Sequence, residues 1–192
     1  MDIHKPQDLE KLQSYYFAKL FSLVFLLGSG AGGCNFGHFI PSIQYLQSKN
    51  GTQFLSQDYP SVGSTNVCQT KGSVSRKIIG PTLSYTGVNY NDEAALLQAV
   101  SRGSVFVGIN AAAQGFQYYA SGVLNLSAND CDPFELDHAV TLVGYGYDST
   151  TRLNYWKVKN SWSTTWGEGG YARIARGTNV CGIATNAYEA TL

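Results

Sequence analysis

Hydrophobic positions divide the chain into a helical first part and a strand-rich second part. Within residues 1–31, four apolar side chains recur at helical spacing: Leu12, Tyr16, Leu20 and Val24. We therefore expect a helix there. The segment FIPSIQYLQSKNG predicts a second, shorter helix, with Pro41 in its first turn and Asn50-Gly51 at its end. Residues 52–80 are polar and irregular and contain two strand candidates at most.

The pattern changes after Pro81, where short runs of β-branched and aromatic residues alternate with glycines. The strand candidates are TLSYTGVNY, SVFVGINA, HAVTLVGYGY, NYWKVKNSW and GYARIARG. Between the first two lies NDEAALLQAVSRG, which predicts a helix opened by Asn91 and closed by Arg102-Gly103. The second half of the chain is therefore expected to be a mostly antiparallel sheet or barrel that carries one helix.

The charges on the chain are balanced. Its 192 residues include 13 Lys plus Arg and 13 Asp plus Glu, so the formal net charge is zero. No block of like charge stands out, and we expect neither nucleic acid nor an anionic membrane surface as a partner. The apolar run at residues 21–27 is far shorter than the about 20 residues that a spanning helix needs, so no transmembrane span is expected. This run fits either the core of a signal peptide or a buried amphipathic helix.

The chain has four cysteines: Cys34, Cys68, Cys131 and Cys181. None belongs to a Cys-x-x-Cys pair, so the pattern indicates no zinc or redox site, and we expect no metal or cofactor. Structural disulfides and free buried thiols are both compatible with this pattern. Disulfides would indicate an oxidising compartment, and the glycosylation acceptors Asn50-Gly51-Thr52 and Asn125-Leu126-Ser127 are compatible with export.

His138 opens one predicted strand, and Asn160 ends the next. A histidine that acts as a base needs a partner that fixes its tautomer, and the carbonyl oxygen of an asparagine accepts a ring N–H without adding charge. Trp162 and Trp166 follow Asn160, and indole rings over that hydrogen bond would keep water from competing for it. The pattern favours a catalytic pair, with a buried core histidine as the alternative.

Five short motifs occur in order around these residues: His138-Ala139-Val140, Gly144-Tyr145-Gly146, Lys159-Asn160-Ser161-Trp162, Trp166-Gly167-Glu168 and Gly170-Tyr171. Upstream lies the segment Gly33-Cys34-Asn35-Phe36-Gly37. It differs from the loop sequence Gly-Cys-Asn-Gly-Gly only at Phe36. In this order the motifs resemble those of the papain-like cysteine peptidases. The resemblance extends over about residues 33–192. A plain glycine turn is the alternative for the upstream motif.

The resemblance implies an α+β, two-lobed fold with a truncated helical lobe and an antiparallel β-barrel lobe. On this chain it implies a divergent helix in residues 1–32, a remnant of the helical lobe in residues 33–80, and the barrel lobe in residues 81–192. It also implies a disulfide between Cys131 and Cys181. Two other cysteines, Cys34 and Cys68, lack their usual partners, so they pair with each other or remain thiols.

Roles for individual residues follow from the same resemblance. His138 would be the acid and base, Asn160 would orient it, Trp162 would shield the pair, and Trp166 would form a wall on the leaving-group side. Gly37 would contact the substrate backbone, and Ala139 and Gly108 would line the pocket for the side chain two positions before the cut. The substrate would be a peptide or protein, bound in an extended conformation.

The family's nucleophile lies in a Cys-Gly-Ser-Cys-Trp type segment at the start of a long helix, and a preceding glutamine donates to the oxyanion. Neither segment occurs in these 192 residues. Ser14 is too close to Cys34 to replace the nucleophile, because the family has a long helix and a further loop between the two elements.

Three interpretations follow from these observations. The chain is a cysteine peptidase that lacks its nucleophile-bearing amino-terminal segment, or a non-catalytic homologue that binds peptides or partner proteins. The third interpretation is a secreted β-domain that converged on the motifs, which requires His138 and Asn160 to lie far apart. We expect a lysosomal, vacuolar or extracellular location.

Overall fold

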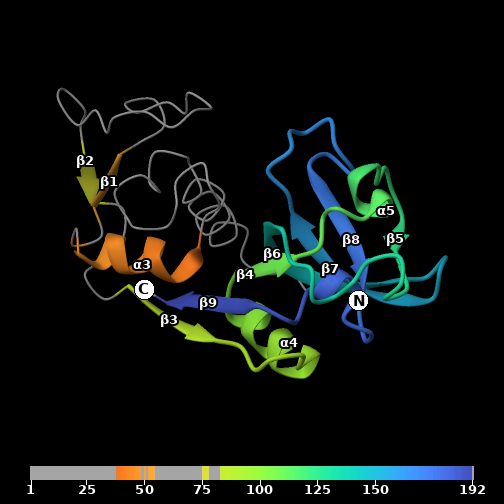
Figure 1. Cartoon of the computed structure of the whole chain (residues 1–192), viewed down its shortest axis with the longest axis horizontal. Helices are drawn as coiled ribbons and strands as arrows, with labels where there is room; N and C mark the ends of the chain where they lie inside the picture. The colour runs from red at the N-terminus through yellow and green to blue at the C-terminus, as the bar shows by residue number, and fades with distance from the viewer. Residues whose placement is uncertain (1–37, 49, 51, 55–74, 78–82, 192) are drawn as a thin grey trace. The chain divides into compact units, whose positions relative to one another are not determined.

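A computed structural model of the chain describes residues 38–48, 50, 52–54, 75–77 and 83–191 (Figure 1). These residues belong to two compact units: one contains Gly87–Glu189, and the other contains the described part of Lys19–Thr86 together with the start of Ala190–Leu192. The helix expected in residues 1–31 lies outside the described residues, as do Cys34, Gly37 and Cys68. The division that we expect near Pro81 stays a prediction.

The smaller unit contains the predicted short helix, α3 (Phe39–Ser48). Its buried apolar side chains, Phe39, Ile43 and Leu46, recur at helical spacing and form one face. Gln47 donates to the backbone oxygen of Leu83 at 2.7 Å. Two short strands, β1 (Thr52–Phe54) and β2 (Ser75–Lys77), pair in antiparallel fashion.

A seven-stranded sheet, of which five strands lie wholly in the larger unit, has the strand order β3-β9-β4-β6-β7-β8-β5 (Figure 1). The strands are β3 (Ser84–Gly87), β4 (Val105–Ile109), β5 (Val123–Leu124), β6 (His138–Asp148), β7 (Leu153–Lys159), β8 (Tyr171–Ala175) and β9 (Ala187–Thr191). Strand β4 is antiparallel to β6 and β9, and β7 is antiparallel to β6 and β8. Only β5 runs parallel to its partner, β8, among these registered pairs. The expected mostly antiparallel sheet is confirmed.

The core of the larger unit lies between this sheet and the elements that cover it. Every residue of β4 is buried, which agrees with its continuous apolar sequence. On β7 the buried residues Trp156 and Val158 alternate with exposed Lys157, as expected for a strand with one face toward the core. Two short helices complete this unit: α5 (Gln114–Gln117), which buries Phe116, and the 3₁₀ helix η1 (Val180–Gly182).

Helix α4 (Glu93–Arg102) is present where the sequence predicts it, but it begins differently. The capping residue is Asp92, whose carboxylate accepts from the backbone N–H of Ala95 at 2.8 Å. The expectation that Asn91 caps the helix is wrong. Asn91 has a φ of 54° and donates its backbone N–H to Ala184, so it forms the left-handed turn before the helix instead.

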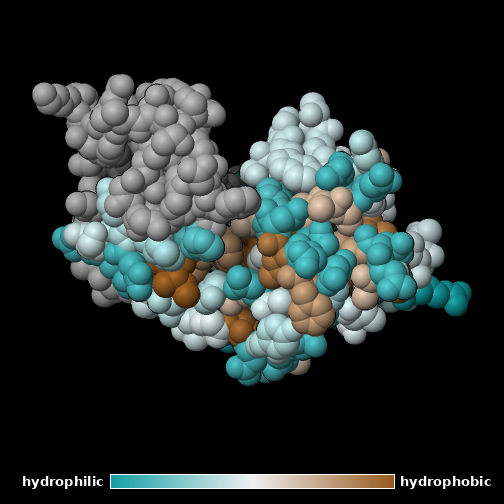
Figure 2. Space-filling model, in the orientation of Figure 1, coloured by the Kyte–Doolittle hydropathy of each residue, from teal (hydrophilic) through white to brown (hydrophobic). Residues whose placement is uncertain are grey.

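Most of the face of the larger unit seen in Figure 2 is hydrophilic or neutral, and apolar residues appear on it in small separate areas. This distribution agrees with a core that is buried inside the unit. Among the described residues, no helix combines the length and the apolar character that a membrane crossing requires.

Candidate active site

The position of His138 is set by the pairing of β6 with β4. His138 opposes Ile109 and Ala139 opposes Gly108 in this ladder. The preceding residue, Asp137, donates its N–H to the backbone oxygen of Ile109 at 3.1 Å, and its carboxylate accepts from the N–H of Ala111 at 2.7 Å. The start of β6 is therefore fastened to β4 and to the residues that follow β4.

Asn160 follows directly after β7, the other neighbour of β6. The pairing of Thr141 with Lys159 brings the end of β7 beside the start of β6. His138 Nε2 and Asn160 Oδ1 are 2.9 Å apart, so the structure brings together the two residues that the motifs singled out. Asn160 is only 7% exposed, which removes water as a competitor for this hydrogen bond.

The orientation of the Asn160 carboxamide determines the tautomer of His138. Asn160 Oδ1 also accepts from the backbone N–H of Ser161 at 2.7 Å. The atom facing that N–H must be an acceptor, so the oxygen and not the NH₂ group lies beside the imidazole. Neutral His138 therefore carries its proton on Nε2 and presents the lone pair of Nδ1. The Asn160 Nδ2 group is buried and has no hydrogen-bond partner among the described residues.

Four aromatic side chains, Phe116, Tyr119, Trp162 and Trp166, form an aromatic cluster around this pair. The ring of Trp162 lies 4.9 Å from that of His138, centroid to centroid, at an interplanar angle of 31°. Phe116 packs against Trp162 and Trp166 at 5.5 Å and 5.0 Å. Trp166 also donates its indole N–H to the backbone oxygen of Gln117 at 3.1 Å. Both tryptophans are thus attached to α5, and Trp162 covers the imidazole.

Burial lowers the pKa of His138 below its usual value. The hydrogen bond with Asn160 and the negative charge of Asp137 both act in the opposite direction, but burial outweighs them. The imidazole of His138 is accordingly neutral at pH 7 and available as a base.

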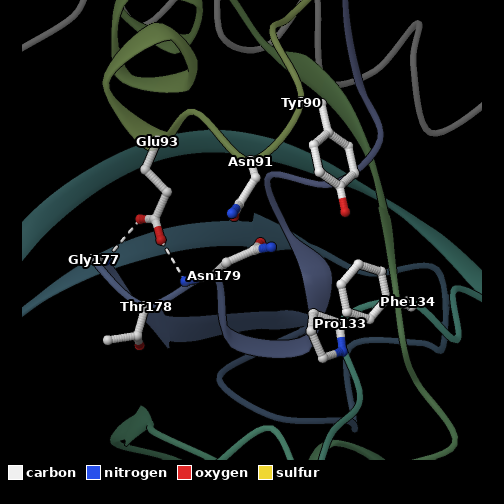
Figure 3. A pocket seen from close by; sticks show the side chains of 8 residues that line it. All are labelled: Tyr90, Asn91, Glu93, Pro133, Phe134, Gly177, Thr178 and Asn179. Atoms are coloured by element: carbon white, nitrogen blue, oxygen red, sulfur yellow. Dashed lines mark hydrogen bonds between the residues drawn. The ribbon is translucent and has the colours of Figure 1, made fainter.

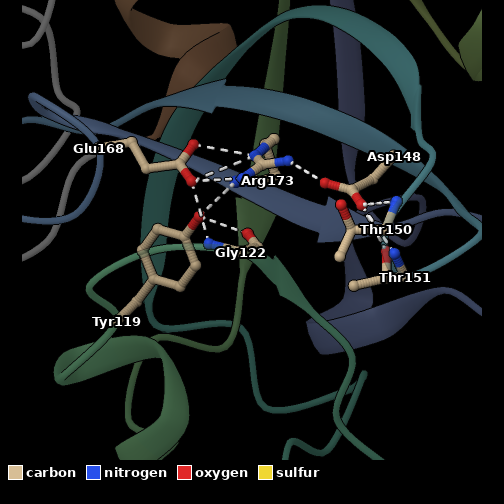
Figure 4. Close-up of polar contacts among 7 residues, drawn as sticks. All are labelled: Tyr119, Gly122, Asp148, Thr150, Thr151, Glu168 and Arg173. Atoms are coloured by element: carbon tan, nitrogen blue, oxygen red, sulfur yellow. Dashed lines mark hydrogen bonds and ion pairs between the residues drawn. The ribbon is translucent and has the colours of Figure 1, made fainter.

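A network of charged groups surrounds the hydroxyl of Tyr119, one member of the aromatic cluster (Figure 4). Arg173 contacts both carboxylate oxygens of Glu168 and one of Asp148, with N–O distances of 2.5 to 3.2 Å. Glu168 also accepts from the N–H of Gly122, and the Tyr119 hydroxyl donates to the oxygen of Gly122 at 2.6 Å. The ring of Tyr119 packs 5.6 Å from Trp166, so Tyr119 belongs to both the network and the cluster.

The hydrogen bonds of this network stabilise its charged forms. Those from Arg173 hold the pKa of Glu168 below its usual range. The backbone N–H of Thr151 is the largest of the contacts that lower the pKa of Asp148. Burial raises the pKa of Tyr119. All three shifts keep Glu168 and Asp148 charged and Tyr119 protonated at neutral pH, so the network persists there.

The other residues singled out in the sequence have different surroundings. Gly108 faces Ala139 across the ladder, and a Cβ on Gly108 would lie 3.3 Å from a methyl carbon of Leu136. Close packing is thus a sufficient reason for this glycine, and the substrate-lining roles of Gly108 and Ala139 stay predictions. Gly37 lies outside the described residues. No group of potential metal ligands is found among the residues that the structure describes.

The disulfide between Cys131 and Cys181 is present, and both cysteines are buried. It closes a segment with a sequence separation of 50 residues. The loop-closure entropy that such a crosslink removes from the unfolded chain corresponds to about 4 kcal/mol. The crosslink joins the segment after β5 to helix η1, and both of its cysteines contact the backbone of Asn110, the residue that follows β4.

Sequence reasoning missed three contributors to the site: Phe116, Tyr119 and Arg173. Phe116 and Tyr119 belong to or follow a four-residue helix that is too short for a periodic pattern. Arg173 lies on a predicted strand, but its two carboxylate partners are 5 and 25 residues away in the sequence. The aromatic run Phe116-Gln117-Tyr118-Tyr119 was the available signal, because the indoles of Trp162 and Trp166 need apolar partners.

Comparison with known proteins agrees with this geometry. The sequence profile described as papain family cysteine protease matches residues 26–191. Cathepsin L of Sarcophaga peregrina is 39% identical over 159 residues, which cover 81% of this chain and 44% of the relative. Fruit bromelain of Ananas comosus is 34% identical over 182 residues, which cover 93% of this chain and 49% of the relative. The chain thus spans less than half the length of these relatives.

Solved structures show the same similarity. The bromelain protease from Ananas comosus superposes with a TM-score of 0.76 at 30% identity, over 96% of this chain and 87% of that one. A cysteine protease from Carica candamarcensis superposes with a TM-score of 0.75 at 29% identity, over 93% of this chain and 88% of that one. The α+β fold described above is therefore papain-like, and the chain belongs to the papain family of cysteine proteases.

Proposed function

We propose that this chain carries the acid and base machinery of a cysteine-type peptidase that hydrolyses peptide bonds in peptide or protein substrates. The observation that supports this most directly is the 2.9 Å contact between His138 and Asn160 in a chain of the papain family. A β-domain that merely converged on the motifs is wrong, because that interpretation required the two side chains to lie far apart.

In the proposed mechanism, Nδ1 of His138 removes the proton from a thiol, and the thiolate attacks the scissile carbonyl carbon. The imidazolium then protonates the leaving amine, so that the C–N bond breaks and an acyl-enzyme remains. Nδ1 next takes a proton from water, whose oxygen attacks the thioester and releases the acid and the thiol. Asn160 keeps the ring oriented throughout, Trp162 excludes water from the pair, and Trp166 contacts the leaving-group side of the substrate.

We assign the nucleophilic thiol to a segment outside these 192 residues. Cys131 and Cys181 are joined in a disulfide, so neither has a free thiol. No cysteine of the chain is followed by tryptophan, as the nucleophile of the family motif is. An upstream coding segment or a second polypeptide would supply the nucleophile and the oxyanion glutamine. Gly37, Gly108 and Ala139 are proposed as contacts for the bound peptide.

The test begins with the nucleotide sequence upstream of the codon for Met1. The proposal expects it to encode a glutamine followed by a Cys-Trp segment. The extended protein should hydrolyse a fluorogenic peptide and react with an epoxide probe for active-site thiols. Replacing His138 by Ala should abolish hydrolysis, whereas Asn160→Ala should reduce it less. An extended protein that reacts with the probe but hydrolyses equally well without His138 would refute the assignment.

An inactive homologue that binds peptides or partner proteins is the second candidate. It is favoured by the same absence of a Cys-Trp segment from the sequence. Transcripts that begin at Met1, together with no reaction of the cellular protein with the epoxide probe, would support this candidate over the peptidase.

We infer a lysosomal, vacuolar or extracellular location from the disulfide, because structural disulfides persist in oxidising compartments. Non-reducing electrophoresis of thiol-alkylated protein from cell fractions tests this inference. Alkylation of Cys131 and Cys181 in freshly lysed cells would contradict it.

A further inference from the structure

A cavity lies in the same unit as the His138–Asn160 pair, at the start of helix α4 (Figure 3). Its volume is about 410 Å³, which is within the range of small-molecule sites. Eight residues line it: Tyr90, Asn91, Glu93, Pro133, Phe134, Gly177, Thr178 and Asn179. We call this cavity the α4 pocket. None of the residues proposed for peptide hydrolysis lines it.

The α4 pocket has one apolar side and one polar side. In Figure 3, Tyr90, Pro133 and Phe134 lie together on one side, and Glu93, Gly177 and Thr178 lie on the other. Asn91 and Asn179 lie between these two sides. Tyr90 is 62% exposed and Phe134 is 70% exposed, so two large rings from distant parts of the sequence keep their faces open to a ligand.

Several polar groups around the pocket have unused hydrogen-bonding capacity. The Asn91 carboxamide, the Thr178 hydroxyl and the Tyr90 hydroxyl have no hydrogen-bond partner among the described residues. Asn179 donates to the Thr185 hydroxyl and accepts from the N–H of Ala184, which leaves its second N–H free. The pocket therefore offers both donors and acceptors to a ligand.

The carboxylate of Glu93 already has three hydrogen-bond donors. Its two carboxylate oxygens accept from the indole N–H of Trp156 and from the backbone N–H groups of Gly177 and Asn179, at 2.6 to 2.9 Å. These three donors stabilise the carboxylate and use its acceptor sites. No Lys or Arg lines the pocket. An anionic ligand would meet no cation there, and a cationic ligand would find a carboxylate that is already engaged.

The walls of the pocket are held in place before any ligand arrives. The disulfide Cys131–Cys181 joins the segment that carries Pro133 and Phe134 to the segment that carries Asn179. The Thr185 hydroxyl, which receives a hydrogen bond from Asn179, donates to the backbone oxygen of Pro133 at 3.0 Å. Preorganisation of this kind reduces the entropy that binding costs.

From these features we propose that the α4 pocket binds a neutral carbohydrate of one or two sugar rings. The C–H face of a pyranose ring stacks on aromatic rings, and its hydroxyls donate to and accept from groups such as the two carboxamides. An extended peptide fits less well, because none of the eight lining residues belongs to a β-strand with which its backbone could pair. This site needs no thiol and does not depend on the proposed peptidase activity.

The test uses ¹H–¹⁵N NMR spectra of the full chain with three neutral probes in the millimolar range: methyl α-mannopyranoside, cellobiose and N,N′-diacetylchitobiose. At least one probe should shift the side-chain amide signals of Asn91 and Asn179. Replacing Tyr90 or Phe134 by Ala should weaken that binding by about five- to tenfold, because each ring supplies part of the stacking surface.

Tyr147→Ala is the matched control, because Tyr147 is similarly exposed, at 59%, and lies outside the pocket. Its binding should equal that of the unsubstituted chain. Tyr90 and Phe134 are both exposed, so their replacement leaves no cavity in the core, and an unchanged His138 signal verifies the fold of each variant. Absence of shifts with all three sugars would overturn the proposal, as would shifts at these amides with choline or a proline-rich peptide alone.

Discussion

The His138–Asn160 pair and the α4 pocket lie in one unit of the chain but are assembled differently. The pair depends on two neighbouring strands, β6 and β7, whose register places the two side chains 2.9 Å apart. Seven of the eight residues that line the pocket come from loops, and a disulfide joins two of these segments. Strand pairing propagates geometry over many residues, whereas loops need local crosslinks to hold a shape.

This contrast predicts that the crosslink affects the pocket more than the pair. Replacing both Cys131 and Cys181 by Ala should lower the free energy of unfolding by about 4 kcal/mol, because the unfolded chain gains the entropy of an open loop. Urea unfolding measures this change. In the NMR spectrum of the folded fraction, the Asn91 and Asn179 amide signals should move more than the His138 ring signals.

The comparison would fail if the double variant shifted the His138 ring signals as much as the pocket signals. Reduction of the unsubstituted chain with a thiol reagent provides the control, because it opens the same loop without changing the sequence.

A second prediction concerns the network beside the aromatic cluster, which depends on side chains rather than on strand register. Glu168→Gln keeps the shape of the side chain but removes the charge that Arg173 contacts. We expect a loss of about 1 kcal/mol, since the side chains involved are partly exposed to solvent. Trp166 fluorescence should change as well, because Tyr119 links Glu168 through Gly122 to this indole.

Glu135→Gln is the matched control for that change, because Glu135 is exposed and lies outside the network. It should alter neither stability nor fluorescence. Equal effects of the two substitutions would mean that the network does not position Trp166.

The smallest expected effect is the pH dependence that His138 contributes. Burial lowers its pKa in the folded chain below the ordinary value of 6.5. The unfolded chain therefore binds the proton more readily, so stability is full above pH 6.5 and falls as the pH decreases toward the pKa of the folded chain. Urea unfolding at a series of pH values from about 7.5 to about 5 checks this prediction, because that interval spans the range in which histidine side chains usually titrate.

His138→Gln removes the titrating group while keeping a polar side chain beside Asn160. The variant should lose the part of the pH dependence that His138 causes. If its stability fell with pH as steeply as that of the unsubstituted chain, then other groups would dominate the slope.

Much of the fold followed from local patterns. Helix α3 and the strands β4, β6, β7 and β8 lie where the alternation and the glycine punctuation predict them. Strand β9 was missed, because the five residues of Ala187–Thr191 have too little pattern to distinguish them from a loop. Its place between β3 and β4 comes from pairing with a strand more than 70 residues away in the sequence, Val105 with Glu189.

The local sequence did not identify the residue that caps helix α4. Both Asn91 and Asp92 are good capping residues, and the sequence does not distinguish them. The choice depends on the hydrogen bond from Asn91 to Ala184, which comes from the far end of the unit. A contact over more than 90 residues therefore decided where a local element begins.

The sequence by itself determined the family resemblance and the strands that position His138 and Asn160; the pairing of Cys131 with Cys181 was implied by that resemblance alone. These features depend on residue identity and short-range order, which motifs and periodicity record. The tertiary structure alone decided the tautomer of His138, the packing of Phe116 and Tyr119 under the indoles, and the α4 pocket. Each of these requires groups from distant segments to meet at hydrogen-bonding or packing distance, and such distances depend on how the whole unit packs.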